Sequence, residues 1–519
     1  MNSNTRTFSA RLTSRALILA VAAALAIPAF ARNQNDAGGA RTLAAAQTAV
    51  IPDTAVGKLA GLLIAAINTG DKDKIKSFLT ANLADNAVRG DSTEGLANDL
   101  RRLYQQSGGI EVMEVIPVKE PNTIRLKLRT KRGNNWVRFV TRLDKDQPTK
   151  LDGWGLRPTL DPETEKAEAW PEGKVTEADA IKEIERHAAA AASRDSFSGV
   201  VLVAKGDRVV FHKAYGNAEK NFCGPNKLDT KFNLGSMNKM FTSVAIAQLV
   251  QAGKLSYEDT LAKVLPEYPN KEIAQKITIH NLLTHTSGLG DFFKEEFFKN
   301  REKYVALKDY FPIFASDPLQ FEPGKSWSYS NAAFIVLGVV VEKVSGQDYF
   351  DYVREHIYKP AGMSDSDSFM RNDIVSNLSY GYTRFGANDQ LGIEPRKINW
   401  MELPIRGSSA GGGYSTAPDL LKFVQALRGY KLLSKELTEK VTSAKVDTRF
   451  SPNIKYGYGF MEEQMSGHIV RGHGGGAPGI NSDLKMFWDG SYTVIVMGNY
   501  DPPAAQDLSQ KIAEFVAKQ

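Results

Sequence analysis

Ser236 and Lys239 lie three residues apart at the start of an apolar stretch, LGSMNKMFTSVAIAQLVQAGKL, residues 234–255. An α-helix places residues i and i+3 on one face, so this hydroxyl and this amine can meet. The helix N-terminus favours an alkoxide, and an amine buried beside the hydroxyl loses its proton more readily than a free lysine. The pair is therefore a candidate nucleophile and base, although the Ser-x-x-Lys spacing alone is common by chance.

Tyr329 and Asn331 are a second candidate pair, in the stretch SYSNAAF, residues 328–334. Because they are two residues apart, an extended segment would point both side chains the same way. Taken in isolation, Tyr329 is better explained as a tyrosine at the edge of a core, with its hydroxyl hydrogen-bonded.

The stretch RGHGGGAPGI, residues 471–480, contains a third candidate, His473. Glycine costs backbone entropy, so a cluster of glycines indicates a close approach of another chain segment or a ligand. Gly474, Gly475 and Gly476 would leave room for the backbone of a substrate to lie against the strand. The alternative is a glycine loop with a solvated histidine.

Together with NLLTHTSGL (281–289) and AGGGYSTAPDLLKF (410–423), these motifs resemble those of the β-lactamase-related serine hydrolases. That family includes class C β-lactamases, DD-carboxypeptidases, D-aminopeptidases and esterases. The resemblance covers residues 177–519. It implies that Ser236 is the nucleophile, Lys239 its base and Tyr329 the proton carrier.

The resemblance also implies substrate-binding groups. Asn331 would bind an amide or carbonyl of the substrate, and the N–H groups of Gly476 and Ser236 would form an oxyanion hole. His473 stands where class C β-lactamases have a lysine. A neutral histidine can hydrogen-bond Tyr329 or the substrate, but it anchors a carboxylate less reliably than a lysine does.

The function expected from these residues is hydrolysis of an ester or a D-peptide-type amide through an acyl-enzyme, without a metal or an organic cofactor. The expected partner is a small-molecule ester, a D-amino-acid peptide or a peptidoglycan-like substrate. β-Lactamase activity is the first alternative. A non-catalytic protein that binds peptide or peptidoglycan is the second, although all the motif positions hold competent residues.

Two weaker signals compete with this interpretation. GSSAG, residues 407–411, fits Gly-x-Ser-x-Gly with Ser409 central, but the glycines that follow would break the helix that such a serine needs. His280 and His285 lie five residues apart without a nearby carboxylate in a known ligand pattern, so no metal site is predicted. His285 is expected to tie a turn.

Periodicity predicts the elements that position these residues in 177–519. The domain opens with a helix and a hairpin that turns at Gly206–Asp207, and it closes with a hairpin that turns at Asp489–Gly490 and a final helix. Hairpins at both ends indicate one antiparallel sheet built from both chain ends. We expect an α+β, β-lactamase/transpeptidase-like domain, with helices flanking the sheet and a mostly helical subdomain.

Residues 54–160 read as a separate, small α+β domain in which helices precede alternating strands, similar to the NTF2-like cone fold. One face of the strand around 122–131 carries Arg125, Lys127 and Arg129. A solvated sheet face is favoured there over a site for an anionic partner. Residues 161–176 are acidic, contain two prolines and are interpreted as a linker.

The N-terminus has the features of a secretory signal peptide over residues 1–31, with arginines before the apolar run 16–27 and small residues, Ala29 and Ala31, before the expected cleavage point. The run is too short to span a membrane. We therefore expect an exported protein, periplasmic or secreted, without a membrane span in the mature chain. Residues 32–53 read as a disordered lead-in.

The chain of 519 residues is too long for one ordinary domain. Removing the signal peptide takes away three arginines and no acidic residue, so the formal net charge of +6 falls by three. Such a small charge gives no reason to expect nucleic-acid binding. The single cysteine excludes an intrachain disulfide. The oligomeric state stays open.

Overall fold

The computed structural model describes residues 49–88, 92–384, 395–448, 450–451 and 453–519. The predicted signal peptide and most of the predicted lead-in lie outside these residues. Ala49 N donates to Val112 O at 2.9 Å, and Ile51 packs on the core of the N-terminal unit. The ordered unit therefore begins before Thr54.

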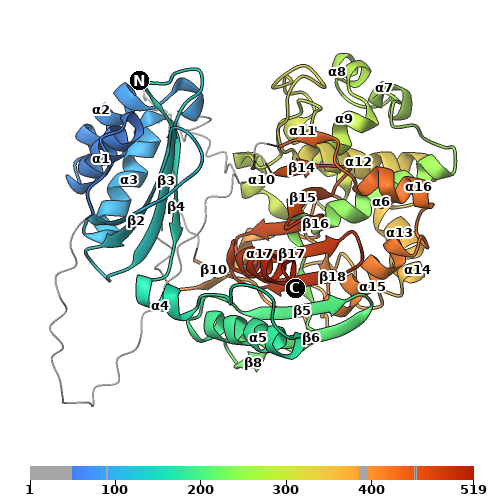
Figure 1. Ribbon diagram of the computed structural model, residues 1–519. Coiled ribbons are helices and arrows are strands. Elements are labelled where there is room, and N and C mark those ends of the chain that lie inside the picture. The colour runs from blue at the N-terminus through green and yellow to red at the C-terminus, as the bar shows by residue number, and fades with distance from the viewer. Residues whose placement is uncertain (1–48, 89–91, 385–394, 449, 452) are drawn as a thin grey trace, which may run out of the picture.

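The N-terminal unit packs helices against a sheet that has four antiparallel strands within the described residues (Figure 1). Ile124, Leu126 and Leu128 alternate along one strand and are buried in the core. The elements are α1 (Ala55–Asn68), α2 (Lys72–Asn82), α3 (Thr93–Ser107), β1 (Ile110–Ile116), β2 (Thr123–Thr130), β3 (Trp136–Leu143) and β4 (Leu151–Pro158). The α+β character is as predicted, and the likeness to the NTF2-like fold stays a prediction.

The predicted linker contains a short helix, α4 (Pro162–Ala167). Asp161 caps it by accepting from Thr164 N at 2.9 Å. Glu165 on this helix forms an ion pair with Lys127, which is only 2% exposed. A buried ammonium needs such a partner. The expectation of a solvated basic face on β2 is therefore wrong at Lys127, because α4 covers it.

Eight strands of the described large domain form one antiparallel sheet in the order β13-β14-β15-β16-β17-β18-β5-β6. Strand β18 pairs with β5 from Tyr492–Lys205 to Gly498–Gly199, so both ends of the domain meet in this sheet. The bounds are β5 (Gly199–Lys205), β6 (Arg208–Tyr215), β13 (Val446–Asp447), β14 (Ile454–Tyr456), β15 (Met461–Met465), β16 (His468–Ala477), β17 (Ile480–Phe487) and β18 (Tyr492–Gly498).

Both faces of this sheet are covered by helices, as predicted. Val201 and Val203 of β5 belong to the core under α5 (Glu177–Ser193) and α17 (Ala504–Val516). Leu202 points the other way, as alternation along a strand requires, into the core with the remaining long helices. Figure 1 shows α5 and α17 on the near side of the sheet. The helices of the opposite layer are α6 (Asn238–Gln251), α12 (Asn331–Ser345) and α15 (Ala417–Arg428).

Shorter elements complete the large domain. The helices are α7 (Leu261–Val264), α8 (Lys271–Lys276), α9 (Ile279–Leu283), α10 (Glu295–Lys299), α11 (Phe311–Phe314), α13 (Tyr349–Val353), α14 (Lys359–Ala361) and α16 (Lys435–Thr442). Short strands pair outside the main sheet: β7 (Asn217–Glu219) with β8 (Gly224–Pro225), β9 (Phe232–Asn233) with β12 (Tyr414–Ser415), and β10 (Tyr382–Thr383) with β11 (Lys397–Ile398).

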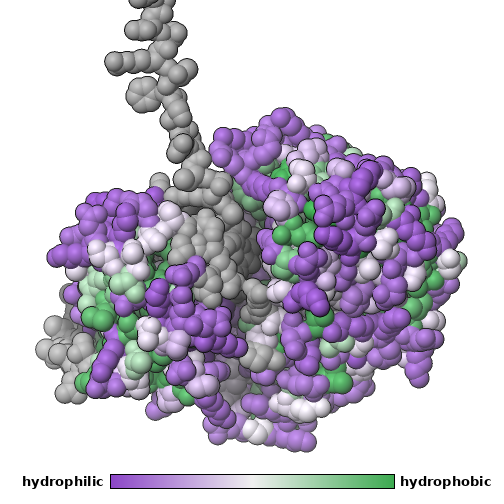
Figure 2. Space-filling view, turned by 90° about the horizontal axis from the view of Figure 1, so that it is seen from above, coloured by the Kyte–Doolittle hydropathy of each residue, from purple (hydrophilic) through white to green (hydrophobic). Residues whose placement is uncertain are grey.

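Hydrophilic residues cover most of the face in Figure 2, and hydrophobic residues form small separate groups on it. Among the helices of the described segments, none has the length and apolar character needed to cross a membrane.

Candidate active site

Ser236 lies in a 3₁₀ turn, Gly235–Met237, that leads into α6, and Lys239 is the second residue of this helix. A 3₁₀ turn repeats every three residues and so stacks side chains i and i+3. Lys239 Nζ is 3.1 Å from Ser236 Oγ. Ser236 is half-buried, whereas Lys239 is completely buried. The structure therefore brings the predicted nucleophile and base together.

The amine of Lys239 has two further partners, both oxygen acceptors. It donates to Asn331 Oδ1 at 2.8 Å and to the carbonyl oxygen of Ala410 at 2.5 Å. Burial lowers the pKa of Lys239 from 10.5 to about 7. A neutral amine keeps two N–H groups and one lone pair. If the two carbonyl-type oxygens take the N–H groups, the lone pair faces Ser236 Oγ, which is the orientation a general base needs.

Tyr329 and Asn331 reach the site from the start of α12. Ser330 between them is extended and caps this helix by accepting from Ala333 N. The hydroxyl of Tyr329 hydrogen-bonds Ser236, and burial raises the pKa of Tyr329 above its ordinary value of 10.0. Tyr329 therefore stays protonated at neutral pH and can pass a proton only as it receives one.

Asp291 is a site residue that the sequence analysis missed. Its Oδ2 accepts from Asn331 Nδ2 at 2.8 Å and from Asn331 N at 3.2 Å. These bonds turn Asn331 Oδ1 toward Lys239, because a carboxylate only accepts. Burial raises the pKa of Asp291, and the contact with Asn331 opposes this rise. The available signal was its place directly after the HTSGLG stretch.

His285 ties two loops together, which confirms the expected turn role. Its backbone has a positive φ of 60°. Its carbonyl accepts from Ser328 N at 3.0 Å, and its Nδ1 accepts from Ser330 N at 3.1 Å. The imidazole centre lies 4.3 Å from the ring centre of Tyr329. His285 thus fixes the backbone on both sides of Tyr329.

His473 lies on β16, and its 2% exposure shows that the ring is buried. Its Nε2 is 2.9 Å from Tyr456 Oη, and its Nδ1 is 2.5 Å from the carbonyl oxygen of Gly474. The carbonyl can only accept, so Nδ1 carries the proton and Nε2 accepts from Tyr456. His473 thus bonds Tyr456 where a bond to Tyr329 was expected, and a bond from His473 to substrate stays a prediction.

The electrostatics of His473 follow from this burial. Burial, reinforced by the nearby Lys239, lowers the pKa of His473 from 6.5 to about 3. The ring is therefore neutral across the physiological pH range. No sequence pattern pointed to Tyr456, because its strand β14 is only three residues long.

Gly475 and Gly476 lie against the turn that carries Ser236. A Cβ atom on Gly235 would be 2.9 Å from Gly476 N and 3.1 Å from Gly475 Cα. The φ of Gly235 is +51°, so this position favours glycine on two counts. The end of β16 and the Ser236 turn are therefore in contact. The role of the Gly476 and Ser236 N–H groups as an oxyanion hole stays a prediction.

The loop with the discounted serine supports the base. Ser409 is completely buried, and its carbonyl accepts from Thr242 Oγ1 at 2.7 Å. The next carbonyl, of Ala410, binds Lys239. Within the described segments, no group of three or more His, Cys, Asp or Glu side chains could hold a metal ion.

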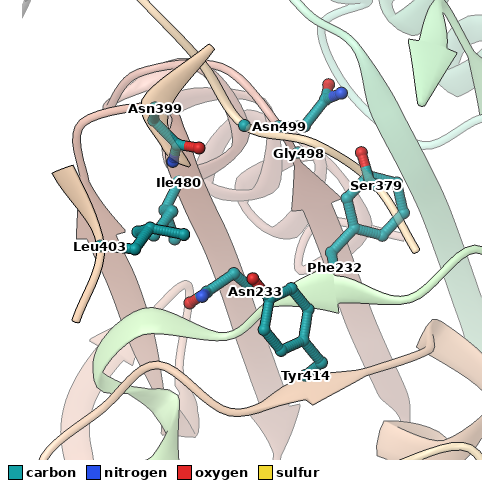
Figure 3. A pocket seen from close by; sticks show the side chains of 11 residues that line it. Phe232, Asn233, Ser379, Asn399, Leu403, Tyr414, Ile480, Gly498 and Asn499 are labelled. Atoms are coloured by element: carbon teal, nitrogen blue, oxygen red, sulfur yellow. The ribbon is translucent and has the colours of Figure 1, made fainter. Parts of the chain in front are cut away.

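A small pocket lies beside the paired strands β9 and β12 (Figure 3). Its volume is about 10 Å³, room for one water molecule, so a substrate does not fit. The pocket adjoins the segment before Ser236 and the β16–β17 turn. It is lined by Phe232, Asn233, Ser379, Gly381, Asn399, Leu403, Tyr414, Gly479, Ile480, Gly498 and Asn499.

A serine, a buried lysine and a tyrosine in mutual contact define a serine hydrolase site of the Ser-x-x-Lys type. Penicillin-binding proteins and β-lactamases share this arrangement of nucleophile and lysine. The family model described as "Beta-lactamase" matches residues 181–518. The chain therefore belongs to the beta-lactamase family of serine hydrolases.

Three known proteins illustrate what this chain is similar to. Penicillin-binding protein 4* of Bacillus subtilis (strain 168) is 31% identical over 318 residues, 59% of this chain and 69% of the relative. Esterase EstB of Burkholderia gladioli is 33% identical over 262 residues, 44% of this chain and 65% of EstB. The crystal structure of a D-stereospecific amidohydrolase from Streptomyces sp. is 26% identical with a TM-score of 0.56, covering 66% of this chain and 99% of that one.

The first prediction concerns pH. Lys239 accepts the Ser236 proton only when neutral, and burial holds its pKa at about 7. We expect kcat/KM for a p-nitrophenyl ester to rise as the pH rises through about 7, tenfold per pH unit well below that value. A His468→Gln variant, altered at a histidine paired with Asp489, should keep this rise. A flat profile between pH 5 and 9 would contradict the assignment of the base.

The second prediction concerns Asp291→Asn. Loss of a hydrogen bond from a charged partner costs about 1.5–3 kcal/mol, so kcat should fall about 10- to 100-fold. The negative charge of Asp291 raises the pKa of Lys239, so the variant's pH–rate rise should move to lower pH. Asp317→Asn, altered at a carboxylate paired with Lys294, is the matched control. An unmoved pH profile would leave Asp291 with only a structural role.

Proposed function

We propose that the protein hydrolyses neutral esters, or amides of the D-peptide type, through an acyl-enzyme on Ser236. The observation that carries this proposal is the contact between Ser236 Oγ and Lys239 Nζ at 3.1 Å, in a site that holds the pKa of Lys239 at about 7. Such an amine is a competent base near neutral pH.

The chemistry requires two acyl transfers. Ser236 Oγ attacks the carbonyl carbon as Lys239 takes the serine proton, and the amides of Ser236 and Gly476 hold the oxyanion. The bond to the leaving alcohol or amine then breaks, and Tyr329 passes it a proton that Lys239 replaces. Water attacks the acyl-serine by the same route, releasing the carboxylic acid and free Ser236.

The preference for neutral substrates rests on His473. The buried ring is uncharged and bonded to Tyr456, so it supplies no cation for the carboxylate of a β-lactam or a peptide terminus. The names of an esterase and a D-stereospecific amidohydrolase among the relatives agree with this preference. β-Lactamase activity, and a binding role without turnover, are the competing functions.

The third prediction tests this proposal with a fluorophosphonate probe, a penicillin probe and mass spectrometry. We expect an adduct on Ser236 in the wild type and in Ser409→Ala, the buried serine of the alternative motif, and none in Ser236→Ala. Hydrolysis of a p-nitrophenyl ester should fall at least about 1,000-fold in Ser236→Ala.

Two other outcomes of the same measurements would favour the competing functions. If folded protein takes up neither probe, the binding role replaces the hydrolase. If a chromogenic cephalosporin is turned over with a kcat/KM far above that of the p-nitrophenyl ester and a D-amino-acid anilide, β-lactamase activity replaces the proposed specificity.

We also propose that residues 1–31 direct export and that the substrate is met in the periplasm or outside the cell. The fourth prediction follows from the small residues Ala29 and Ala31 before the expected cleavage point. In a bacterial host, mass spectrometry of the exported protein should find Arg32 as its first residue. Retention in the cytoplasm with Met1 intact would overturn this assignment.

A further inference from the structure

Aromatic side chains form a wall beside the catalytic tyrosine. The ring centre of Phe450 lies 5.1 Å from that of Trp327, with the planes nearly perpendicular at 79°. It also lies 5.9 Å from the ring centre of Tyr329. The contact with Trp327 has the edge-to-face geometry that aromatic pairs favour, and the contact with Tyr329 is tilted at 52°.

The members of this wall differ in exposure. Trp327 is 8% exposed and Tyr456 is completely buried, whereas Phe450 is 38% exposed. The buried rings hold the wall in place, and Phe450 presents an apolar surface to solvent next to the half-buried Tyr329. An exposed aromatic ring supported from behind is suited to bind another flat apolar group.

The position of the wall indicates which half of a substrate it contacts. Tyr329 hydrogen-bonds Ser236, and in the proposed reaction it protonates the leaving atom. That atom must then lie within hydrogen-bond reach of the Tyr329 hydroxyl. Phe450 is the exposed aromatic side chain in ring contact with Tyr329. A group attached to the leaving atom therefore meets Phe450 if it extends over the Tyr329 ring.

We propose that Phe450, supported by Trp327, forms a leaving-group subsite for aromatic alcohols and amines. This inference rests on the proposed acyl-transfer function. The neutral His473 is consistent with it, because a leaving group without a carboxylate needs no cation. The subsite selects the leaving group by stacking and burial of apolar surface. It does not discriminate between acyl groups.

The fifth prediction compares two acetate esters whose leaving groups have similar acidity, phenyl acetate and hexafluoroisopropyl acetate. In Phe450→Ala, kcat/KM for the phenyl ester should fall about 10-fold, and that for the fluoroalkyl ester less than about 2-fold. Phe450→Tyr keeps the ring and should keep the selectivity. Phe222→Ala, which removes a 90% exposed phenylalanine from the β7–β8 turn, is the matched control.

A second pair of substrates separates the two halves of the substrate. Phenyl acetate and phenyl phenylacetate share a leaving group and differ in the acyl group. If Phe450→Ala changes the ratio between these two esters, or lowers both acetate esters equally, the leaving-group subsite is overturned while the hydrolase stands. If the wild type hydrolyses none of the esters and takes up no probe on Ser236, the proposed function fails, and the subsite fails with it.

Discussion

The burial of one amine governs the architecture of this site. Lys239 is completely buried, and a buried ammonium is costly unless oxygen acceptors surround it. The acceptors come from distant parts of the chain: the hydroxyl of Ser236, the amide oxygen of Asn331 and the carbonyl of Ala410. The structure satisfies the amine well enough to retain it and leaves it desolvated enough to titrate near neutrality. Activity and packing therefore depend on the same nitrogen.

The helical layer acts as a support for this nitrogen. α6 carries Lys239 and α12 begins at Asn331, while Asp291 holds the far end of the asparagine amide. His285 fixes the chain before α12 through two hydrogen bonds to its backbone. The sheet contributes a second boundary, because β16 presses on Gly235 closely enough to exclude a side chain there. A shift of either layer would move the serine relative to its base.

The predictable part of the site consists of side chains whose chemistry and local spacing stand out in the sequence. Ser236–Lys239 and Tyr329–Asn331 could be recognised because each pair acts over two or three residues. The carbonyl of Ala410 could not, since a backbone oxygen has no signature in sequence. The bond between His473 and Tyr456 joins two strands whose pairing is indirect, through β15, so it changed the expected partner of the histidine.

In the fold, too, features set by neighbouring residues could be predicted, whereas contacts between distant segments could not. The hairpins at both ends and their union in one sheet follow from alternation and turn residues, and the structure confirms them. The linker was harder to interpret. Its acidic residues and two prolines predicted a linker, whereas Glu165 within it is the partner that allows Lys127 of β2 to be buried. Charge alone cannot distinguish a solvated acid from one that covers a base on another element.

The pairing of strands from both ends of the domain has a consequence for the order in which the site forms during synthesis. β5, which precedes the nucleophile, has β18 as its neighbour on one side, and the strand that borders the Ser236 turn is β16. Both β16 and β18 follow Ser236 in the sequence, so a ribosome makes these strands after it has made the serine. Until β16 is made and paired, the nascent chain lacks the strand that borders its Ser236 turn, so the complete site forms only after most of the domain has been synthesised.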